Sequence, residues 1–217
     1  MKIKLVEILV LVGGICLLAA PLTTQAAGDH GRANVVYVAH LHAMNSNVTG
    51  YQAIGEARFT ITGDTLTIRI RMQGVPPDIE HWQHFHGFKD NHAASCPTAT
   101  ADVNHDGIID LIETEPASGI TMVPFNDNPA ATQIVSDTYP KTSADGAYRY
   151  QETVSLKAMK TAFAKAFGNA DLDLDRRVVF IHGVPMTVKL PASVASLGTI
   201  PAQVTLPIAC GKIERIR

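Results

Sequence analysis

Alternation of β-branched and apolar residues with polar ones constrains the fold more than any other feature of the sequence. It recurs in segments long enough for a strand, at residues 34–42, 51–63, 64–75, 147–156, 176–184 and 202–213. Successive side chains of a strand point to opposite faces, so this pattern predicts strands with one buried face. Gly63-Asp64 predicts a tight turn between the second and third segments. We therefore expect an all-β fold, a Greek-key β-sandwich or flattened barrel with antiparallel strands.

One segment has the period of a helix. Residues 156–167 place Leu156, Met159, Phe163 and Phe167 along one stripe, and Gly168 follows as a stop signal. We interpret this segment as one short helix that packs on the sheet.

The first 26 residues are typical of a signal peptide. Lys2 and Lys4 precede an apolar run at residues 8–20, and the small residues Ala26 and Ala27 follow. We expect cleavage there and an exported protein, periplasmic or extracellular. Residues 27–217 then form a single domain, because about 190 residues suit one core and no internal repeat is present.

Charge and hydropathy exclude two classes of partner. The formal net charge is −2, and removal of residues 1–26 takes away Lys2, Lys4 and Glu7 and makes it −3. A weakly acidic chain predicts no basic surface for nucleic acid. After residue 20 no apolar run of about 18 residues follows, so we expect no membrane span.

Residues 102–113, DVNHDGIIDLIE, match a calcium-binding loop of the EF-hand type. Its ligands would be the side chains of Asp102, Asn104, Asp106, Asp110 and Glu113 with the carbonyl of Ile108, and Gly107 would take the sharp turn. Oxygen donors at these spacings suit Ca²⁺. Pro97 and Pro116 and the poor helix formers around the loop predict a single calcium clip without paired helices. The alternative is an acidic surface turn.

Two histidines at alternating positions precede a cysteine, and a second cysteine follows much later. The first stretch, HFHGFKDNHAASC, covers residues 84–96, and the second, IACGKI, covers residues 208–213. A third stretch, RRVVFIHGV at 176–184, ends an apolar strand in His182. Together they resemble the copper/zinc superoxide dismutases, in which an H-x-H strand and a later histidine strand supply copper ligands. The resemblance implies that Cys96 and Cys210 form a disulfide.

The composition supports the same disulfide. Cleavage of the signal peptide removes Cys16 and leaves only Cys96 and Cys210, an even number in an oxidising compartment. The alternative is two buried free thiols.

The resemblance implies a copper site built from His84, His86 and His182. Side chains at i and i+2 of a strand share a face, so His84 and His86 can bind one ion. A fourth ligand would be His92 or His105. The H-x-H pair His40 and His42 has no counterpart in the family, and we interpret it as a solvated strand face.

Departures from the family bear on activity. Residues 112–176 contain no histidine, so the family's zinc site is not expected. Where the family has an arginine that attracts superoxide, three residues before the last cysteine, this chain has Pro207. Because steering by positive charge gives such enzymes their speed, dismutation should be slow or absent.

The first half of the chain also resembles the CHRD repeat of chordin and of exported bacterial proteins. The matching residues are Gly55, Ala57 and Phe59, then 63–66, then Gly74-Val75. CHRD repeats are not known as enzymes, so this resemblance implies a non-catalytic domain.

Three functions therefore remain open: a copper-dependent redox enzyme acting on superoxide, a calcium-stabilised binding or structural domain, and a protein that stores or delivers copper. We favour metal binding without efficient dismutation.

Overall fold

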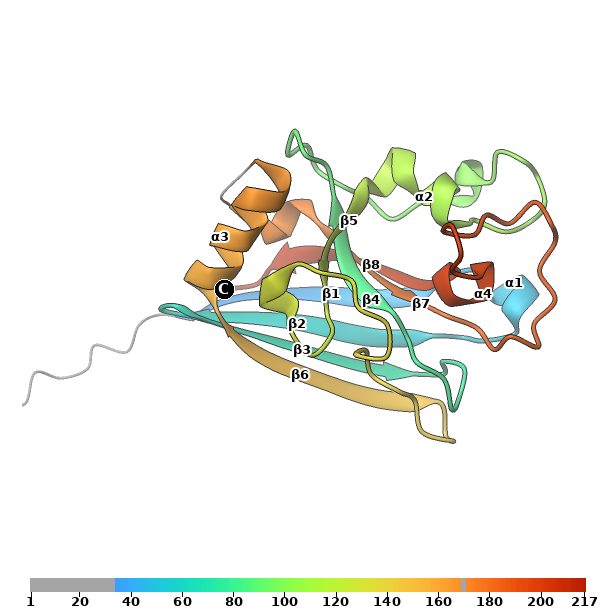
Figure 1. The fold of residues 1–217 in the computed structure, drawn as a ribbon, viewed down its shortest axis with the longest axis horizontal. Helices are drawn as coiled ribbons and strands as arrows, with labels where there is room; N and C mark the ends of the chain where they lie inside the picture. The colour runs from blue at the N-terminus through green and yellow to red at the C-terminus, as the bar shows by residue number, and fades with distance from the viewer. Residues whose placement is uncertain (1–33, 169–170) are drawn as a thin grey trace, which may run out of the picture. The chain divides into compact units, whose positions relative to one another are not determined.

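The computed structural model describes residues 34–168 and 171–217, so the predicted signal peptide lies outside the described residues. An eight-stranded antiparallel sheet with the order β5-β4-β7-β8-β1-β2-β3-β6 forms the fold (Figure 1). The strands are β1 (Val35–Ala43), β2 (Ile54–Thr62), β3 (Thr65–Gln73), β4 (Gln83–Gly87), β5 (Ile120–Pro124), β6 (Ala147–Ser155), β7 (Val178–His182) and β8 (Pro207–Arg215). The predicted all-β fold is confirmed.

The predicted strands agree with the structure except near residue 202. Residues Ala202–Thr205 form a short helix, and β8 begins only at Pro207. The hairpin of β2 and β3 turns at Gly63, whose φ of 59° suits glycine. The sequence patterns did not predict β5, a strand of five residues.

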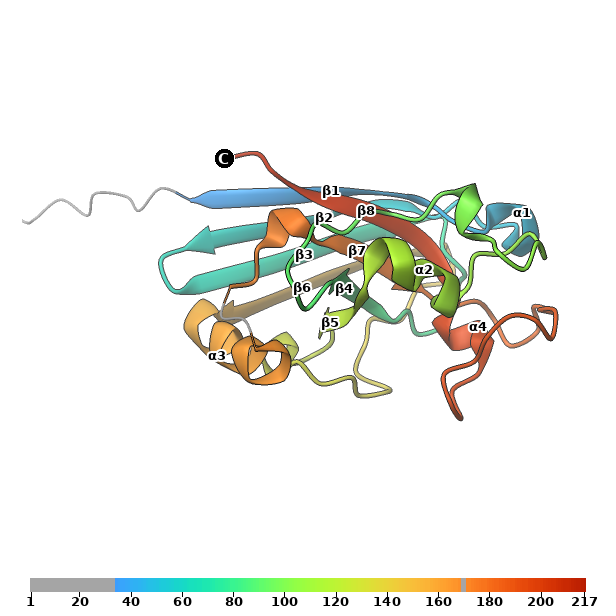
Figure 2. The same ribbon diagram turned by 90° about the horizontal axis from the view of Figure 1, so that it is seen from above.

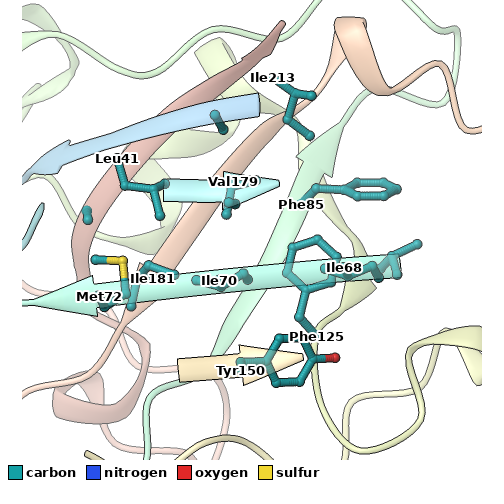
Figure 3. Packing of buried hydrophobic residues seen from close by; sticks show 14 of the residues in the cluster. Leu41, Ile68, Ile70, Met72, Phe85, Phe125, Tyr150, Val179, Ile181 and Ile213 are labelled. Carbon is teal, nitrogen blue, oxygen red and sulfur yellow. The ribbon is translucent and has the colours of Figure 1, made fainter. Parts of the chain in front are cut away.

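The sheet curls so that its two halves enclose one apolar core. Ile68 and Ile70 from β3 lie across from Phe85 of β4 and Ile181 of β7 (Figure 3). Each of these side chains is at most 1% exposed. Removing such a side chain from water stabilises the fold by about 1.5–3 kcal/mol. Every residue of β4 and β7 is buried, so both faces of these strands are covered.

The helices are α1 (Ser46–Thr49), α2 (Leu111–Ser118), α3 (Leu156–Phe167) and α4 (Ala202–Thr205), with 3-10 turns at Ala99–Ala101, Pro129–Ala131 and Leu174–Arg176. The predicted helix, α3, is confirmed: Met159 and Phe163 are buried, and Gly168 ends it with a φ of 76°. The expectation of one helix was wrong. α1 and α4 lie at one end of the strands and α3 at the other (Figure 2).

The helix α2 forms despite Pro116, against the expectation of non-helical flanks around residues 102–113. Asp110 caps it, because its side chain accepts hydrogen bonds from the amides of Ile112 and Glu113, while Glu113 accepts one from the amide of Asp110. This capping box supplies partners for amides that lack one at a helix start. Within the described part of the chain, no helix is both long and apolar enough to cross a membrane.

Candidate metal site

Three buried histidines meet on the face of the sheet opposite the apolar core. His84 and His86 extend from β4, and His182 from β7. Phe180 of β7 is the cross-strand partner of His84, and Val178 is that of His86. Because cross-strand partners share a face, all these side chains lie on the side away from Phe85.

Two irregularities of the sheet adjoin the histidines. The register of β4 against β5 shifts between Phe85 and His86, and that of β7 against β8 shifts between Ile181 and His182. Such bulges turn a side chain away from its regular direction. The rings of His84 and His182 come within 4.6 Å, centroid to centroid, although the two residues belong to different strands.

The three histidines can converge on one ion. One ring nitrogen from each lies within 4.8 Å of the others, and the side chains are 1–4% exposed. Nitrogens that bind one ion at about 2.1 Å are at most about 4.2 Å apart, so binding would draw the rings slightly closer. Within residues 34–168 and 171–217, this is the one group of three or more His, Cys, Asp or Glu residues with that proximity.

Hydrogen bonds determine which ring nitrogen of His86 and of His182 is free to bind a metal. His182 Nδ1 donates to the Thr205 carbonyl at 2.6 Å, which leaves Nε2 with its lone pair. His86 Nδ1 donates to the Gly119 carbonyl at 3.0 Å, and its Nε2 lies 3.1 Å from the Thr121 hydroxyl, from which it can accept a hydrogen bond. A carbonyl behind the ring is the usual means of orienting a histidine that binds a metal.

Two of the nitrogens lack any partner. His84 Nδ1 and His182 Nε2 are buried and form no hydrogen bond. A buried polar atom left unpaired costs about 1–3 kcal/mol. Metal coordination would satisfy both atoms, so their position favours a ligand role over a packing role.

Gly119 brings its carbonyl to His86 because only glycine fits there. Its φ is 73°, and a Cβ at this position would collide with the carbonyl of Gly87 on β4. The chain thus passes directly from α2 into β5 along the edge of β4. Sequence patterns identified neither Gly119 nor Thr121 nor Thr205, because these residues act through backbone carbonyls or cross-strand register.

Burial makes the three imidazoles neutral. Burial lowers the pKa of His86 to about 3 and that of His182 to about 4. The pKa of His86 is lowered further because its protonated ring would be repelled by a protonated His182. Burial also lowers the pKa of His84 well below its usual value, with smaller contributions from His182 and His86. Neutral imidazole is the form that binds metals.

These shifts predict that acid destabilises the metal-free protein. Between the folded pKa values and the ordinary value of 6.5, the unfolded chain binds more protons, so the free energy of unfolding falls as pH falls. From pH 7 to pH 5, His86 and His182 should each lower the free energy of unfolding by about 2 kcal/mol. Urea unfolding with a chelator, at several pH values in this range, measures it.

Replacing exposed His40 and His42 with asparagine provides the control, and it should leave the pH dependence unchanged. A free energy of unfolding that is equal at pH 7 and pH 5 would contradict the prediction.

The two candidates for a fourth ligand lie apart from this group. His92 is exposed, stacks on Phe88 and hydrogen-bonds to Asp90 at 2.6 Å. His105 is also exposed, within the acidic loop, with a φ of 60°. Neither belongs to the group formed by His84, His86 and His182.

The acidic loop 102–113 is held by its own side chains. Asp102 accepts hydrogen bonds from the amides of Asp106 and Gly107, and Glu113 Oε1 accepts them from the amides of Val103 and Asn104. These carboxylates are therefore turned toward the loop interior.

The same loop contacts the segment between β7 and β8. Asp106 accepts a hydrogen bond from the Ser193 hydroxyl, and Asp110 accepts one from the amide of Ala195, both at 2.6 Å. The Ile108 side chain is buried in the core. The loop thus forms part of the cover over the same end of the strands as α4.

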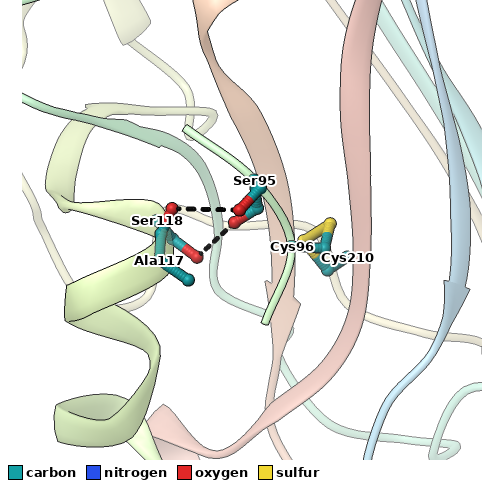
Figure 4. Close-up of a disulfide and its surroundings, with 5 residues drawn as sticks. All are labelled: Ser95, Cys96, Ala117, Ser118 and Cys210. Atoms are coloured by element: carbon teal, nitrogen blue, oxygen red, sulfur yellow. Dashed lines mark hydrogen bonds between the residues drawn. A yellow bond between two sulfur atoms is a disulfide. The ribbon is translucent and has the colours of Figure 1, made fainter. Parts of the chain in front are cut away.

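A disulfide joins Cys96 to Cys210, as predicted, with 5.9 Å between the Cα atoms. Cys96 lies in the segment after β4, and Cys210 lies on β8. Ser95 and Ser118 fasten this segment to α2: the Ser118 hydroxyl donates to the Ser95 carbonyl, and the Ser95 amide donates to Ala117 (Figure 4). The disulfide therefore ties α2, and with it Gly119, to the last strand.

The other three histidines of the described residues, His40, His42 and His81, do not belong to the candidate metal site. His40 and His42 are exposed on β1. His81 is completely buried, with its ring nitrogens 2.9 Å from the carbonyls of His182 and Pro76.

No protein-family profile matches this chain, and no curated protein matches it.

Proposed function

We propose that this protein binds one copper ion through His84 Nδ1, His86 Nε2 and His182 Nε2. The observation that supports the proposal best is that His84 Nδ1 and His182 Nε2 are buried without a hydrogen-bond partner, on two members of a group of three neutral imidazoles. Imidazole nitrogen suits copper, which binds most tightly among the common divalent metals. Elemental analysis of the purified, copper-loaded protein is the direct test.

The three histidine ligands suit copper better than they suit a structural zinc ion. A structural zinc site usually has four protein ligands, whereas three histidines converge here. The Thr121 hydroxyl lies 3.1 Å from His86 Nε2 and 3.5 Å from His84 Nε2, so it stands beside the group and can orient a water at a remaining position.

Efficient dismutation of superoxide is not part of the proposal. Bound copper would supply one-electron redox chemistry, but the three histidines are at most 4% exposed, which limits entry of an anion. The strand partner of His182 is the buried, uncharged Pro207. No arginine therefore stands at this position to attract superoxide.

The chain's origin in the dismutase-like superfamily and its export are parts of the same proposal. Support comes from two histidines on β4, one on β7, and a disulfide from the segment after β4 to β8, the arrangement that the sequence resemblance implies. A periplasmic or extracellular location agrees with this disulfide. The competing proposal, a non-catalytic domain like the CHRD repeats, requires that copper does not bind.

We also propose that loop 102–113 binds calcium as a structural clip. The loop has oxygen donors at the spacing of an EF-hand, its Gly107 has a φ of 82°, and Asp110 and Glu113 are nearly buried. Calcium would replace the amides that now satisfy the carboxylates of Asp102 and Glu113. Because Asp106 and Asp110 also contact residues 193–195, the ion would fasten that segment to α2.

Calcium should raise the melting temperature, since a ligand that binds only the folded state stabilises it. At a calcium concentration of 100 times the dissociation constant the gain is about 2.7 kcal/mol, or roughly 5–10 °C. Glu113→Gln should remove most of this rise because it takes away a bidentate charge. Calorimetry measures the melting temperatures of the unaltered protein and of the variant, each in calcium and in chelator.

Glu115→Gln is the matched control, because Glu115 is exposed on α2 and outside the ligand positions. It should keep the full calcium effect. Equal melting temperatures of the unaltered protein in calcium and in chelator would show an acidic turn instead of a calcium site.

A further inference from the structure

One face of the sheet carries a lattice of arginines that neither metal site uses. This face is formed by alternate residues of β2, β3 and β6, and it points away from the apolar core. Cross-strand partners form five rows across the three strands, which we call rungs: Thr62–Thr65–Ser155, Thr60–Thr67–Thr153, Arg58–Arg69–Gln151, Glu56–Arg71–Arg149 and Ile54–Gln73–Ala147. We call these residues the arginine face.

The arginines stand directly opposite one another. Arg58 is the cross-strand partner of Arg69, and Arg71 is that of Arg149. Like charges in this position destabilise a sheet. The net charge of −2 gave no sign of this local basic surface, because four arginines face one glutamate here.

Few protein groups neutralise these charges. Arg58 lies 3.5 Å from Glu56, and both side chains are about 40% exposed, while Arg69 donates to Gln151. Within residues 34–168 and 171–217, the guanidinium groups of Arg71 and Arg149 have no hydrogen-bond or ion-pair partner. Both are exposed, so their guanidinium groups can bind an external anion.

A hollow of about 620 Å³ lies at one end of the arginine face. Arg71, Arg149 and Glu56 line it together with Ser143 and Asp145. Ser143 and Asp145 hydrogen-bond to each other. The hollow thus combines two free guanidinium groups with hydroxyl and carboxylate groups that can bind sugar hydroxyls.

The composition of the face excludes other kinds of partner. None of its rungs contains an aromatic residue, so bases of a nucleic acid have nothing on which to stack. Its one exposed large apolar residue is Ile54, too little for insertion into a lipid surface or for the apolar centre of a protein interface. Guanidinium groups bind carboxylate and sulfate through paired hydrogen bonds.

We propose that the arginine face binds an acidic polysaccharide, through its carboxylate or sulfate groups. Neighbouring strands lie about 4.8 Å apart, and alternate residues of one strand about 7 Å apart. Arg58, Arg69, Arg71 and Arg149 therefore present a regular grid of cations to a chain with repeated negative groups. The threonine and glutamine side chains of the other rungs are hydrogen-bonding partners for its hydroxyls.

Binding to immobilised polygalacturonate and to dextran sulfate at low salt tests the proposal, with neutral dextran as the reference. The protein should bind at least one of the two acidic polymers and should release it as salt rises. Arg71→Gln with Arg149→Gln should weaken binding at least about tenfold, because two charge-assisted contacts are lost. Comparison of the two polymers distinguishes carboxylate from sulfate.

Arg215→Gln with Arg217→Gln is the matched control, because it removes the same charge from the last residue of β8 and from Arg217 beyond it, both outside the arginine face. This variant should keep most of the binding. Urea unfolding should find the Arg71/Arg149 variant at least as stable as the unaltered protein, because an opposed like-charge pair has been removed.

Equal weakening in the two double variants would overturn the proposal, as would equal binding to neutral dextran or no binding to either acidic polymer. Binding to vesicles of anionic lipid without binding to either polymer would also overturn it.

Discussion

Replacing His84 and His86 together with alanine should abolish copper binding, from one ion per chain to none. The two residues supply two of the three convergent ring nitrogens. A single remaining imidazole, His182, cannot hold the ion against competing chelators. Copper analysis after gel filtration in the presence of a weak chelator measures the stoichiometry.

His40→Ala with His42→Ala is a matched control within the same chain. It removes the same H-x-H pair from an exposed strand face and should leave one copper bound. Both variants should keep the disulfide and the calcium response, because those features use other residues. Full copper in the His84/His86 variant, or loss of copper in the His40/His42 variant, would refute the proposed site.

The same copper-loaded protein distinguishes binding from catalysis. Its rate of superoxide dismutation should lie far below the diffusion limit, because Pro207 is the strand partner of His182 and the three rings are buried. A rate near that limit would contradict this expectation while leaving the copper site itself intact.

Removal of the disulfide should lower the free energy of unfolding by up to about 4–5 kcal/mol. The bond joins residues 114 positions apart, and closing so long a loop strongly restricts the unfolded chain. Cys96→Ala with Cys210→Ala avoids a free thiol, and urea unfolding measures the loss. After cleavage of the signal peptide, which carries Cys16, the native protein should show no thiol that reacts with an alkylating agent.

Cys210 is buried against Phe180 and Val178, so its replacement also changes packing. Reduction of the unaltered protein gives a second measurement without that change, and both should show a large loss. Equal stability with and without the bond, or two reactive thiols in the native protein, would refute the prediction.

The strands were predictable because burial on one side of a sheet imposes a period of two on the sequence. The ends of β1, β2, β3 and β6 lie within three residues of the predicted ones. β5 was missed because Thr121 interrupts its apolar residues and five residues show no clear period. β7 is equally short, but its unbroken apolar run before His182 revealed it. α2 was missed because its start depends on Asp110 and Glu113, which the sequence interpretation assigned only to calcium.

The candidate site was predictable where spacing carries the information. The interval from His84 to His86 places both on one strand face, and the apolar strand before His182 indicated a third ligand. Gly119 and Thr205 contribute backbone carbonyls, and a backbone group leaves no residue type in the sequence that marks it as a partner of a histidine. The place of His92 depends on its stacking with Phe88, a contact that spacing does not reveal.

The pairing of β1 with β8 has a consequence for the order of folding. These strands come from opposite ends of the described chain, yet β8 also pairs with β7 and so connects the two halves of the sheet. Until β8 has been synthesised, β1 and β7 each present an unpaired edge, which invites association with other chains. Contacts between such distant segments also slow folding. The two halves of the sheet can therefore join only when β8 is in place.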